Sequence, residues 1–338
     1  MVALHSIYQD HWTTALNTFR DPARRSWILV NSTSIFETWI CCAFARAFKA
    51  KHGGPISMVM RETQVPIAWM YREDIDRIVA VEDARLFSIT SRLHGLGSFD
   101  IDQPIVANTY WQGLGNDWHA YGELFAYPGR GGVSYADLTR LMLRLDWEAE
   151  LAPWSIPLDW RIQAALHAKA QGVDPGNSVI LFPENNSSPA LPEAFWQDLA
   201  DALTRDGKKV FTNMAGNNLG RRALPVYGTH PILCDLTNAI PLVETAGRAI
   251  SMNNGLSAML VGLGIDATLT NLIRVPAPGQ DHKVGSIQVK HPIAVQTHRH
   301  LGAARGPLQE YVVDLGRADH RELIEGIARQ DAGLMIGL

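Results

Sequence analysis

Apolar and polar positions alternate in blocks along the first half of the chain. Four short apolar runs rich in β-forming side chains predict strands, over residues 27–30, 56–60, 77–81 and 104–107. Between and after them, apolar residues recur at intervals of three and four and predict helices, over residues 37–51, 64–71 and 135–145. Strands and helices that alternate in this way favour a parallel sheet with right-handed crossovers.

The same alternation restarts in the second half. Strands are predicted over residues 178–182, 209–213, 249–252 and 267–269, and helices over residues 192–206, 240–246, 254–263 and 321–327. Prolines and glycines interrupt the pattern between residues 150 and 177, which places a domain boundary there. We therefore predict an α/β fold with two Rossmann-like domains facing a cleft, over residues 1–160 and 161–310. Residues 311–338 form a further segment, predicted to be helical and to pack back toward the first domain.

Composition excludes several classes of protein. The 338 residues include 30 Lys and Arg against 34 Asp and Glu, and the net charge of -4 argues against a protein that binds nucleic acid. The three cysteines, two of them adjacent, predict neither a disulfide framework nor a zinc site. No apolar run reaches the roughly 18 residues of a membrane span, and residues 1–20 lack the apolar stretch of a secretory signal. We therefore expect a cytoplasmic protein.

Polar turns follow several predicted strands, at the positions where parallel α/β sheets bind ligands. Asn185-Asn186-Ser187-Ser188 follows one strand, Asn253-Asn254-Gly255-Leu256-Ser257 follows another, and Asn213 ends a third. Such residues could offer a diphosphate several N–H groups beside a helix N-terminus. The same residue types also cap helices without binding any ligand, and the sequence leaves both interpretations open.

One carboxylate, Glu37, stands near the start of the first predicted helix, so we expect it to face the same cleft. A carboxylate there could remove the proton from an attacking hydroxyl, provided that its pKa is not far below the working pH. The alternative is that Glu37 only interacts favourably with the helix dipole, as acidic residues in a first turn commonly do.

Several short motifs resemble the family 9 glycosyltransferases, which include the lipopolysaccharide heptosyltransferases. In the first half the motifs are Ile28-Leu29-Val30 and Ser34-Ile35-Phe36-Glu37. In the second half they are Ile180-Leu181-Phe182-Pro183, the segment 191–196, Ile240-Pro241-Leu242-Val243-Glu244 and the turn 251–257. The resemblance covers about residues 26–275.

The resemblance implies a GT-B fold and inverting, metal-independent transfer of a sugar from a nucleotide diphosphate sugar, with no cofactor. It assigns the acceptor to the first domain, the donor to the second domain and the role of general base to Glu37. The donor-binding residues that it implies are Asn185, Asn186, Ser187, Ser188, Asn213, Glu244, Asn253, Asn254, Gly255, Leu256 and Ser257. The expected acceptor-binding residues are Ser34, Trp111, Asn116, Asp117 and Trp118. Most of these belong to an aromatic loop that could instead pack in the core. Asp117 and His119 in that loop are alternative bases.

The sequence departs from the family pattern at three positions of the donor site. Asn253 stands where the family has an aspartate, Ala258 where it has a histidine, and no lysine is found around Pro189-Ala190. A diphosphate leaving group needs positive charge or several N–H donors. The candidates to replace the lysine are Arg221, Arg222 and Arg248, each of which could equally be a solvated surface arginine.

These departures leave two alternatives, a catalytically inactive bilobed binding protein and a sugar-nucleotide epimerase. The expected partners are a nucleotide-sugar donor and an acceptor that is a glycan, a lipid-linked molecule or a protein, as in bacterial glycan biosynthesis. A lipid-linked acceptor would bring the protein to the periphery of a membrane, and the oligomeric state stays open. His298 and His300 alternate without a third ligand nearby, so they predict a surface strand or loop rather than a metal site.

Overall fold

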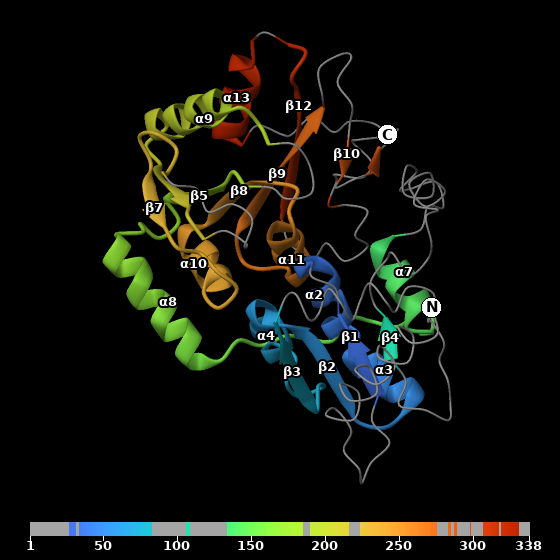
Figure 1. Ribbon diagram of the computed structural model, residues 1–338. Coiled ribbons are helices and arrows are strands. Elements are labelled where there is room, and N and C mark those ends of the chain that lie inside the picture. The colour runs from blue at the N-terminus through green and yellow to red at the C-terminus, as the bar shows by residue number, and fades with distance from the viewer. Residues whose placement is uncertain are drawn as a thin grey trace, which may run out of the picture. The chain divides into compact units, whose positions relative to one another are not determined.

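The computed structural model describes residues 27–31, 34–82, 106–108, 134–184, 190–215, 224–275, 283–284, 287–288, 298, 307–317 and 319–330. They divide into two compact units (Figure 1). The described residues up to 108, together with 136–156, form the first unit. Those from 157 onward, with residues 134–135, form the second. The chain therefore passes into the second unit at Pro157.

The first unit is built on a four-stranded sheet. Its strands are β1 (Trp27–Val30), β2 (Ile56–Arg61), β3 (Arg77–Val81) and β4 (Val106–Asn108). Its helices are α2 (Ile35–Ala43), α3 (Ala45–His52), α4 (Val65–Trp69) and α7 (Tyr135–Met142), with a 3₁₀ turn, η1, at Glu62–Gln64. All neighbouring strands are parallel and the order is β3-β2-β1-β4, the order of the first four strands of a Rossmann sheet. The sequence therefore predicted this parallel sheet correctly, although β4 begins and ends later than expected.

The single helix predicted over residues 37–51 is divided into α2 and α3. The break is at Phe44, whose backbone angles of φ -93° and ψ 3° lie outside the helical range. Beside it, the carbonyl of Ala43 accepts a hydrogen bond from the N–H of Ala152, 2.7 Å away. The segment after α7 thus packs at the break. Amphipathic spacing could not reveal the break, because the apolar positions continue through it.

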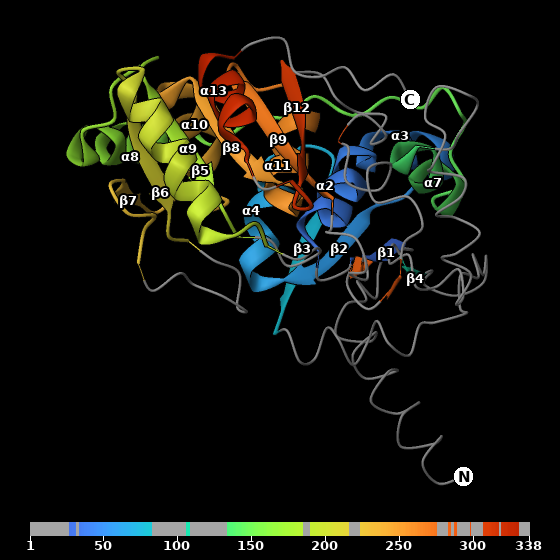
Figure 2. The same cartoon turned by 90° about the horizontal axis from the view of Figure 1, so that it is seen from above.

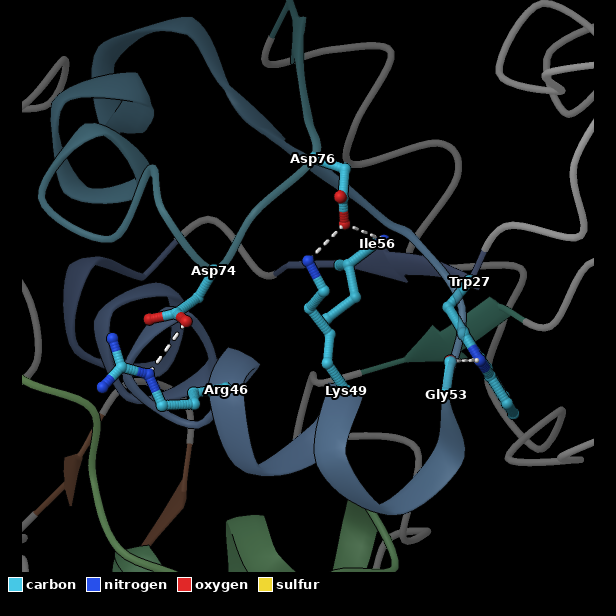
Figure 3. Close-up of polar contacts among 7 residues, drawn as sticks. All are labelled: Trp27, Arg46, Lys49, Gly53, Ile56, Asp74 and Asp76. Carbon is cyan, nitrogen blue, oxygen red and sulfur yellow. Dashed lines mark hydrogen bonds and ion pairs between the residues drawn. The ribbon is translucent and has the colours of Figure 1, made fainter.

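Polar contacts fix α3 to the amino ends of the strands (Figure 3). Lys49 Nζ lies 2.9 Å from Asp76 Oδ2, which also accepts the N–H of Ile56 at 2.7 Å. Burial alone would raise the pKa of Asp76, but these two contacts outweigh it and lower that pKa below its usual range. Arg46 makes a second ion pair, with Asp74, at 2.9 Å. The helix is therefore held at both of its turns.

The helix that carries Glu37, α2, is fixed by buried polar pairs. The hydroxyl of Thr38 lies 3.0 Å from Gln64 Oε1, and the indole N–H of Trp39 donates to the hydroxyl of Tyr71 at 2.9 Å. At the end of β1, Asn31 donates from its side-chain amide to the carbonyl of Val59 at 3.1 Å. Buried polar groups that are paired in this way specify a single packing arrangement. The start of α2 is therefore placed firmly at the carboxyl end of β1.

The second unit contains a six-stranded sheet. Its strands are β5 (Ser178–Phe182), β6 (Lys209–Asn213), β7 (His230–Ile232), β8 (Arg248–Met252), β9 (Thr268–Val275) and β12 (Leu308–Asp314). Its helices are α8 (Leu158–Gln171), α9 (Glu193–Arg205), α10 (Ala239–Ala246), α11 (Gly255–Leu263) and α13 (Arg321–Arg329). A short antiparallel pair, β10 (Lys283–Val284) and β11 (Ile287–Gln288), stands apart from the sheet. The predicted helices and strands of this half are confirmed, but α8, β7 and β12 were not predicted.

The six-stranded sheet is a Rossmann sheet. Its order is β12-β9-β8-β5-β6-β7 and every neighbouring pair is parallel. Counted in chain order, this is the 3-2-1-4-5-6 arrangement read from the opposite edge. Helices α9 and α13 pack side by side on one face (Figure 2), over a core that includes Leu181, Ile250, Leu272 and Val313. Helices α10 and α11 contact the strands, and α8 packs on α10. All residues of β5 are buried, as expected for a central parallel strand covered on both faces.

The C-terminal segment differs from the prediction made for residues 311–338. It begins within the strand β12, which pairs along its length with β9. It continues into α13, which packs against α9 of the same unit. The guanidinium of Arg248 donates to the carbonyls of Ile327 at 2.6 Å and Ala328 at 3.1 Å, at the end of α13. This segment therefore completes the second Rossmann sheet.

No helix in the described part of the chain is long and apolar enough to cross a membrane. The three cysteines, Cys41, Cys42 and Cys234, are all buried and form no disulfide.

Candidate functional site

The strand order of the second sheet indicates where a ligand is expected to bind. In a doubly wound sheet, ligands bind beyond the carboxyl ends of the strands at the point where the strand order reverses. Here that point lies between β5 and β8, which are neighbours in the sheet. After β5 the chain continues through Pro183 and Glu184, and after β8 it continues through Asn253 into α11. The candidate donor site is therefore the edge formed by these two turns.

Asn254 joins the two turns. Its side-chain amide donates to the carbonyl of Glu184 at 3.3 Å, and its carbonyl oxygen accepts the N–H of Ser257 at 2.8 Å. The hydroxyl of Ser257 in turn accepts the N–H of Asn254 at 3.3 Å, which completes a capping box at the start of α11. The side chain of Asn254 is therefore occupied within the protein. Its contribution to a ligand site is to hold the helix N-terminus in place.

The first turn of α11 offers backbone N–H groups to a ligand. The first four N–H groups of a helix have no partner within it, and here only that of Ser257 is satisfied by the cap. The N–H groups of Gly255 and Leu256 have no acceptor within the described part of the chain. Together with the helix dipole, these groups favour an anion such as a phosphate. Of the predicted donor-binding residues, Asn253, Asn254, Gly255, Leu256 and Ser257 thus lie together at this edge.

A network of buried hydrogen bonds connects Ser257 of α11 with three further residues, His298, Glu310 and Asn271. The hydroxyl of Ser257 is 3.0 Å from Nε2 of His298, and the backbone N–H of His298 donates to Oε1 of Glu310 at 2.7 Å. The same oxygen of Glu310 accepts from the side-chain amide of Asn271 at 2.9 Å. Burial lowers the pKa of His298 to about 3, so the ring is neutral at physiological pH. The prediction that His298 lies on a surface strand or loop was wrong, since only 1% of it is exposed.

Two predicted donor-binding residues, Asn213 and Glu244, accept hydrogen bonds from backbone N–H groups of the second unit. The side-chain oxygen of Asn213 accepts the N–H groups of Ala215 and Cys234, both at 2.9 Å, so this amide ties the end of β6 to the end of β7. Glu244 lies in the last turn of α10, where its carboxylate accepts the N–H of Asp266 at 3.4 Å. Asp266 directly precedes β9, so this contact lies at the amino edge of the sheet. Glu244 therefore lies near the amino edge of the sheet, whereas α11 begins at the carboxyl edge, and its role in donor binding stays a prediction.

Two arginines of the second sheet, Arg248 and Arg274, are buried, whereas the prediction considered Arg248 only as a surface residue or a replacement for the lysine. Arg248 starts β8 at the amino edge, is 3% exposed and binds the end of α13, so it is neither a surface residue nor a replacement for the missing lysine. Arg274 was not predicted, although it lies near the carboxyl end of β9 and is 8% exposed. A charged residue inside the apolar strand run 269–275 was the sequence signal that could have identified it.

In the first unit, Glu37 is the third residue of α2, three positions after Ser34. The pattern Ser-x-x-Glu is that of a capping box, but the side chain of Ser34 caps no N–H group of the helix. Oε2 of Glu37 is inaccessible to solvent and has no hydrogen-bond partner within the described residues. Burial raises the pKa of Glu37 from 4.5 to about 7, although the backbone N–H of the same residue offsets part of the rise. The helix dipole alone would lower this pKa, so burial dominates.

The remaining predicted residues lie outside the described residues. They are Trp111, Asn116, Asp117, Trp118, His119, Asn185, Asn186, Ser187, Ser188, Arg221, Arg222 and His300. Within the part of the chain that the structure describes, no group of three or more His, Cys, Asp or Glu side chains could hold a metal ion.

Comparison with known proteins finds similarity in structure only. No family model matches the sequence, and no curated protein matches it. A glycosyl transferase family 9 structure from Veillonella parvula aligns over 90% of this chain and 89% of its own, with 15% identity and a TM-score of 0.52. The Escherichia coli ADP-heptose LPS heptosyltransferase II aligns over 83% and 89%, with 12% identity and a TM-score of 0.50. A putative UDP-N-acetylglucosamine 2-epimerase from Listeria monocytogenes aligns over 83% of this chain and 91% of its own, with 11% identity and a TM-score of 0.43.

At these identities the likeness concerns the fold. It confirms the resemblance to family 9 glycosyltransferases and the GT-B fold that the sequence motifs implied. Because one fold can carry many functions, the activity has to be argued from the residues of the site.

Proposed function

We propose that this protein is an inverting glycosyltransferase that moves a sugar from a nucleoside diphosphate sugar to a hydroxyl group of an acceptor. The observation that carries the proposal is the carboxyl group of Glu37, whose Oε2 is inaccessible to solvent and has no hydrogen-bond partner within the described residues, and whose pKa burial raises to about 7. A base with a pKa near the working pH is best suited to accept a proton during attack. The second unit supplies an anion-binding helix N-terminus at its topological switch point.

The proposed reaction is a single displacement. The oxygen of the acceptor hydroxyl forms a bond with the anomeric carbon, and its proton passes to the carboxylate of Glu37. On the opposite side of that carbon, the bond to the diphosphate oxygen breaks and its electron pair stays on the leaving nucleoside diphosphate. One displacement inverts the configuration of the anomeric carbon. The N–H groups of Gly255 and Leu256 would stabilise the charge of the diphosphate.

The donor proposed first is an ADP-linked sugar, because the name of the similar E. coli enzyme gives ADP-heptose as its substrate. We do not assign heptose itself, since Asn253 and Ala258 replace the aspartate and histidine of the family motif. The proposed transfer needs no metal ion, so turnover should continue in the presence of EDTA. The acceptor is a glycan, a lipid-linked molecule or a protein.

The decisive experiment measures binding and turnover separately. Thermal shifts with ADP, UDP, GDP, CDP and dTDP identify the nucleotide, since a ligand at about 100 times its Kd adds about 2.7 kcal/mol to the free energy of unfolding. Turnover of the matching nucleotide sugar is then followed with candidate acceptors. Replacing Glu37 by Gln should lower kcat by about 10²-fold or more while the Kd of the nucleotide stays unchanged. The matched control is Glu62→Gln, an exposed glutamate of the same unit, which should leave both values unchanged.

Other outcomes would point to the alternatives. Binding of a nucleotide without transfer from any of its sugars would favour an inactive binding protein. Conversion of the donor in the absence of any acceptor would favour an epimerase. If none of the five nucleotides binds, the proposal is overturned.

A further inference from the structure

Helix α8 carries an exposed row of large apolar side chains. Leu158, Ile162 and Leu166 follow one another at intervals of four residues and are 72%, 50% and 58% exposed. The helix packs on α10, and its buried residues, Ala164 and Ala168, lie on the side away from the row. Both views place α8 at the outer edge of the second unit, beside α10 (Figures 1 and 2). The row is therefore an apolar surface that the described part of the chain leaves uncovered.

The row has the geometry of a helix-packing surface. Side chains four residues apart form a ridge along a helix, and such ridges pack into the grooves of a second helix. Beside the centre of the ridge stands Ala165, which is exposed and small, so a groove runs next to Ile162. The same surface of α8 thus offers both parts of a helix–helix contact, a ridge and a groove.

The row is also complementary to itself about Ile162. A two-fold axis beside Ile162 brings a second copy of α8 into antiparallel contact. In that arrangement Leu158 of each copy faces Leu166 of the other, and Ile162 faces its own counterpart. Interfaces that use the same patch on both subunits are the commonest in symmetric oligomers. The pattern of the row therefore fits a second copy of this chain.

The charges on α8 favour the same antiparallel arrangement. Asp159 lies in the first turn and Lys169 in the last, and both are exposed. Neither side chain forms an ion pair within the residues that the structure describes. Antiparallel copies place the acidic end of each helix beside the basic end of the other, whereas parallel copies would place like charges together. Complementary charge of this kind selects the orientation of two partners.

We propose that α8 forms the interface of a symmetric homodimer, in which the row 158–162–166 of one copy packs against the same row of a second copy. This inference is independent of the proposed function, because the row includes neither Glu37 nor a residue of the donor site. Burial of three large aliphatic side chains per copy supplies the driving force. An interface made by one helix of each copy buries less than about 1,200 Å² in total, the size of weak and transient associations. We therefore expect a dissociation constant in the micromolar range.

The test follows the oligomeric state as the protein concentration changes. Sedimentation velocity from about 1 to about 300 μM should show the wild type passing from monomer to dimer. Ile162→Glu places two like charges against each other at the axis, so it should raise the dissociation constant of the dimer by about 100-fold or more. The matched control is Tyr227→Glu, because Tyr227 is 82% exposed and its carbonyl is bonded to Gln197 of α9. This control should leave the dissociation constant unchanged.

A charge swap tests the two-fold arrangement itself. Ile162→Lys should also be monomeric alone, but an equimolar mixture of Ile162→Lys and Ile162→Glu should form dimers again, because opposite charges then meet at the axis. Circular dichroism should show both variants folded, since the side chain that they replace is half exposed. A wild type that stays monomeric at every concentration overturns the proposal. A dimer that Ile162→Glu leaves intact, or a mixture of the two variants that stays monomeric, overturns it as well. None of these results would affect the proposed function.

Discussion

The buried carboxyl group of Glu37 should make the stability of the protein depend on pH in a way that a single substitution removes. Because burial raises its pKa in the folded state from 4.5 to about 7, the folded protein holds this proton more tightly than the unfolded chain does. The contribution of this protonated carboxyl group to the free energy of unfolding is therefore fully present below pH 4.5. It is lost as the pH rises through about 7. Glu37→Gln keeps the shape of the side chain and never becomes charged.

The size of the effect follows from the pKa values. At about 1.36 kcal/mol per pKa unit, a rise from 4.5 to about 7 corresponds to about 3 kcal/mol, which the wild-type protein loses above neutral pH. Below pH 4.5 the two proteins should be almost equally stable. At pH 8.5 the Gln variant should therefore be more stable by up to about 3 kcal/mol. For a unit of this size that corresponds to roughly 6–12 °C in Tm.

The assay is thermal unfolding of wild type, Glu37→Gln and Glu62→Gln at pH 4.5, 6.5 and 8.5. Only the difference between proteins at each pH is interpreted, since all other titrating groups are common to them. The exposed Glu62 should give a difference within about 0.5 kcal/mol at every pH. A difference for Glu37→Gln that is constant across pH would show that this carboxyl group is solvated or ion-paired in the folded protein. In that case the argument for a general base at this position fails.

Two further substitutions test the second unit. Asn254→Ala removes the cap of α11 and its bond to Glu184, so it should cost about 1 kcal/mol of stability and raise the Kd of the nucleotide; an unchanged Kd in calorimetry would remove the helix N-terminus from the donor site. Arg248→Met removes the bonds to the end of α13, so it should cost about 2 kcal/mol or more and speed hydrogen exchange in α13 with no change in Kd. A weaker nucleotide with normal exchange in α13 would instead assign Arg248 to the donor site.

Local pattern was sufficient for most of the fold but not for α8. The strands β1, β2, β5 and β6 are short apolar runs between turn residues, so each could be recognised without knowing its neighbours. In α8, Leu158, Ile162 and Leu166 recur every four residues, a helical signal, but they are exposed. The buried residues of the helix are Ala164 and Ala168. The prolines and glycines on either side of α8 indicated a domain boundary rather than a helix. The small alanines are buried and the large apolar side chains are exposed because α8 packs closely on α10.

The candidate site was predictable only where chain neighbours define it. The turn 253–257 follows a strand and starts a helix, so its capping residues were visible in the sequence. The partners of that turn were not visible, because Glu184 and His298 lie 70 and 41 residues away from the residues that they contact. The contact of Glu244 with Asp266, 22 residues away, was not visible for the same reason. A family motif fixes its position in the sequence but not which edge of the sheet its side chain faces.

The structure also bears on whether the departures from the family motif abolish activity. Asn254 and Ser257 form a cap, so the contribution of this turn lies mainly in backbone N–H groups, which do not depend on the side chain at Asn253. An inactive binding protein would gain nothing from Glu37 as it stands, because its buried carboxyl costs stability above neutral pH and Oε2 makes no hydrogen bond within the described residues. Titratable groups shifted by burial are characteristic of catalytic sites, where stability is given up for chemistry. The proposed role of Glu37 as a general base would account for this cost.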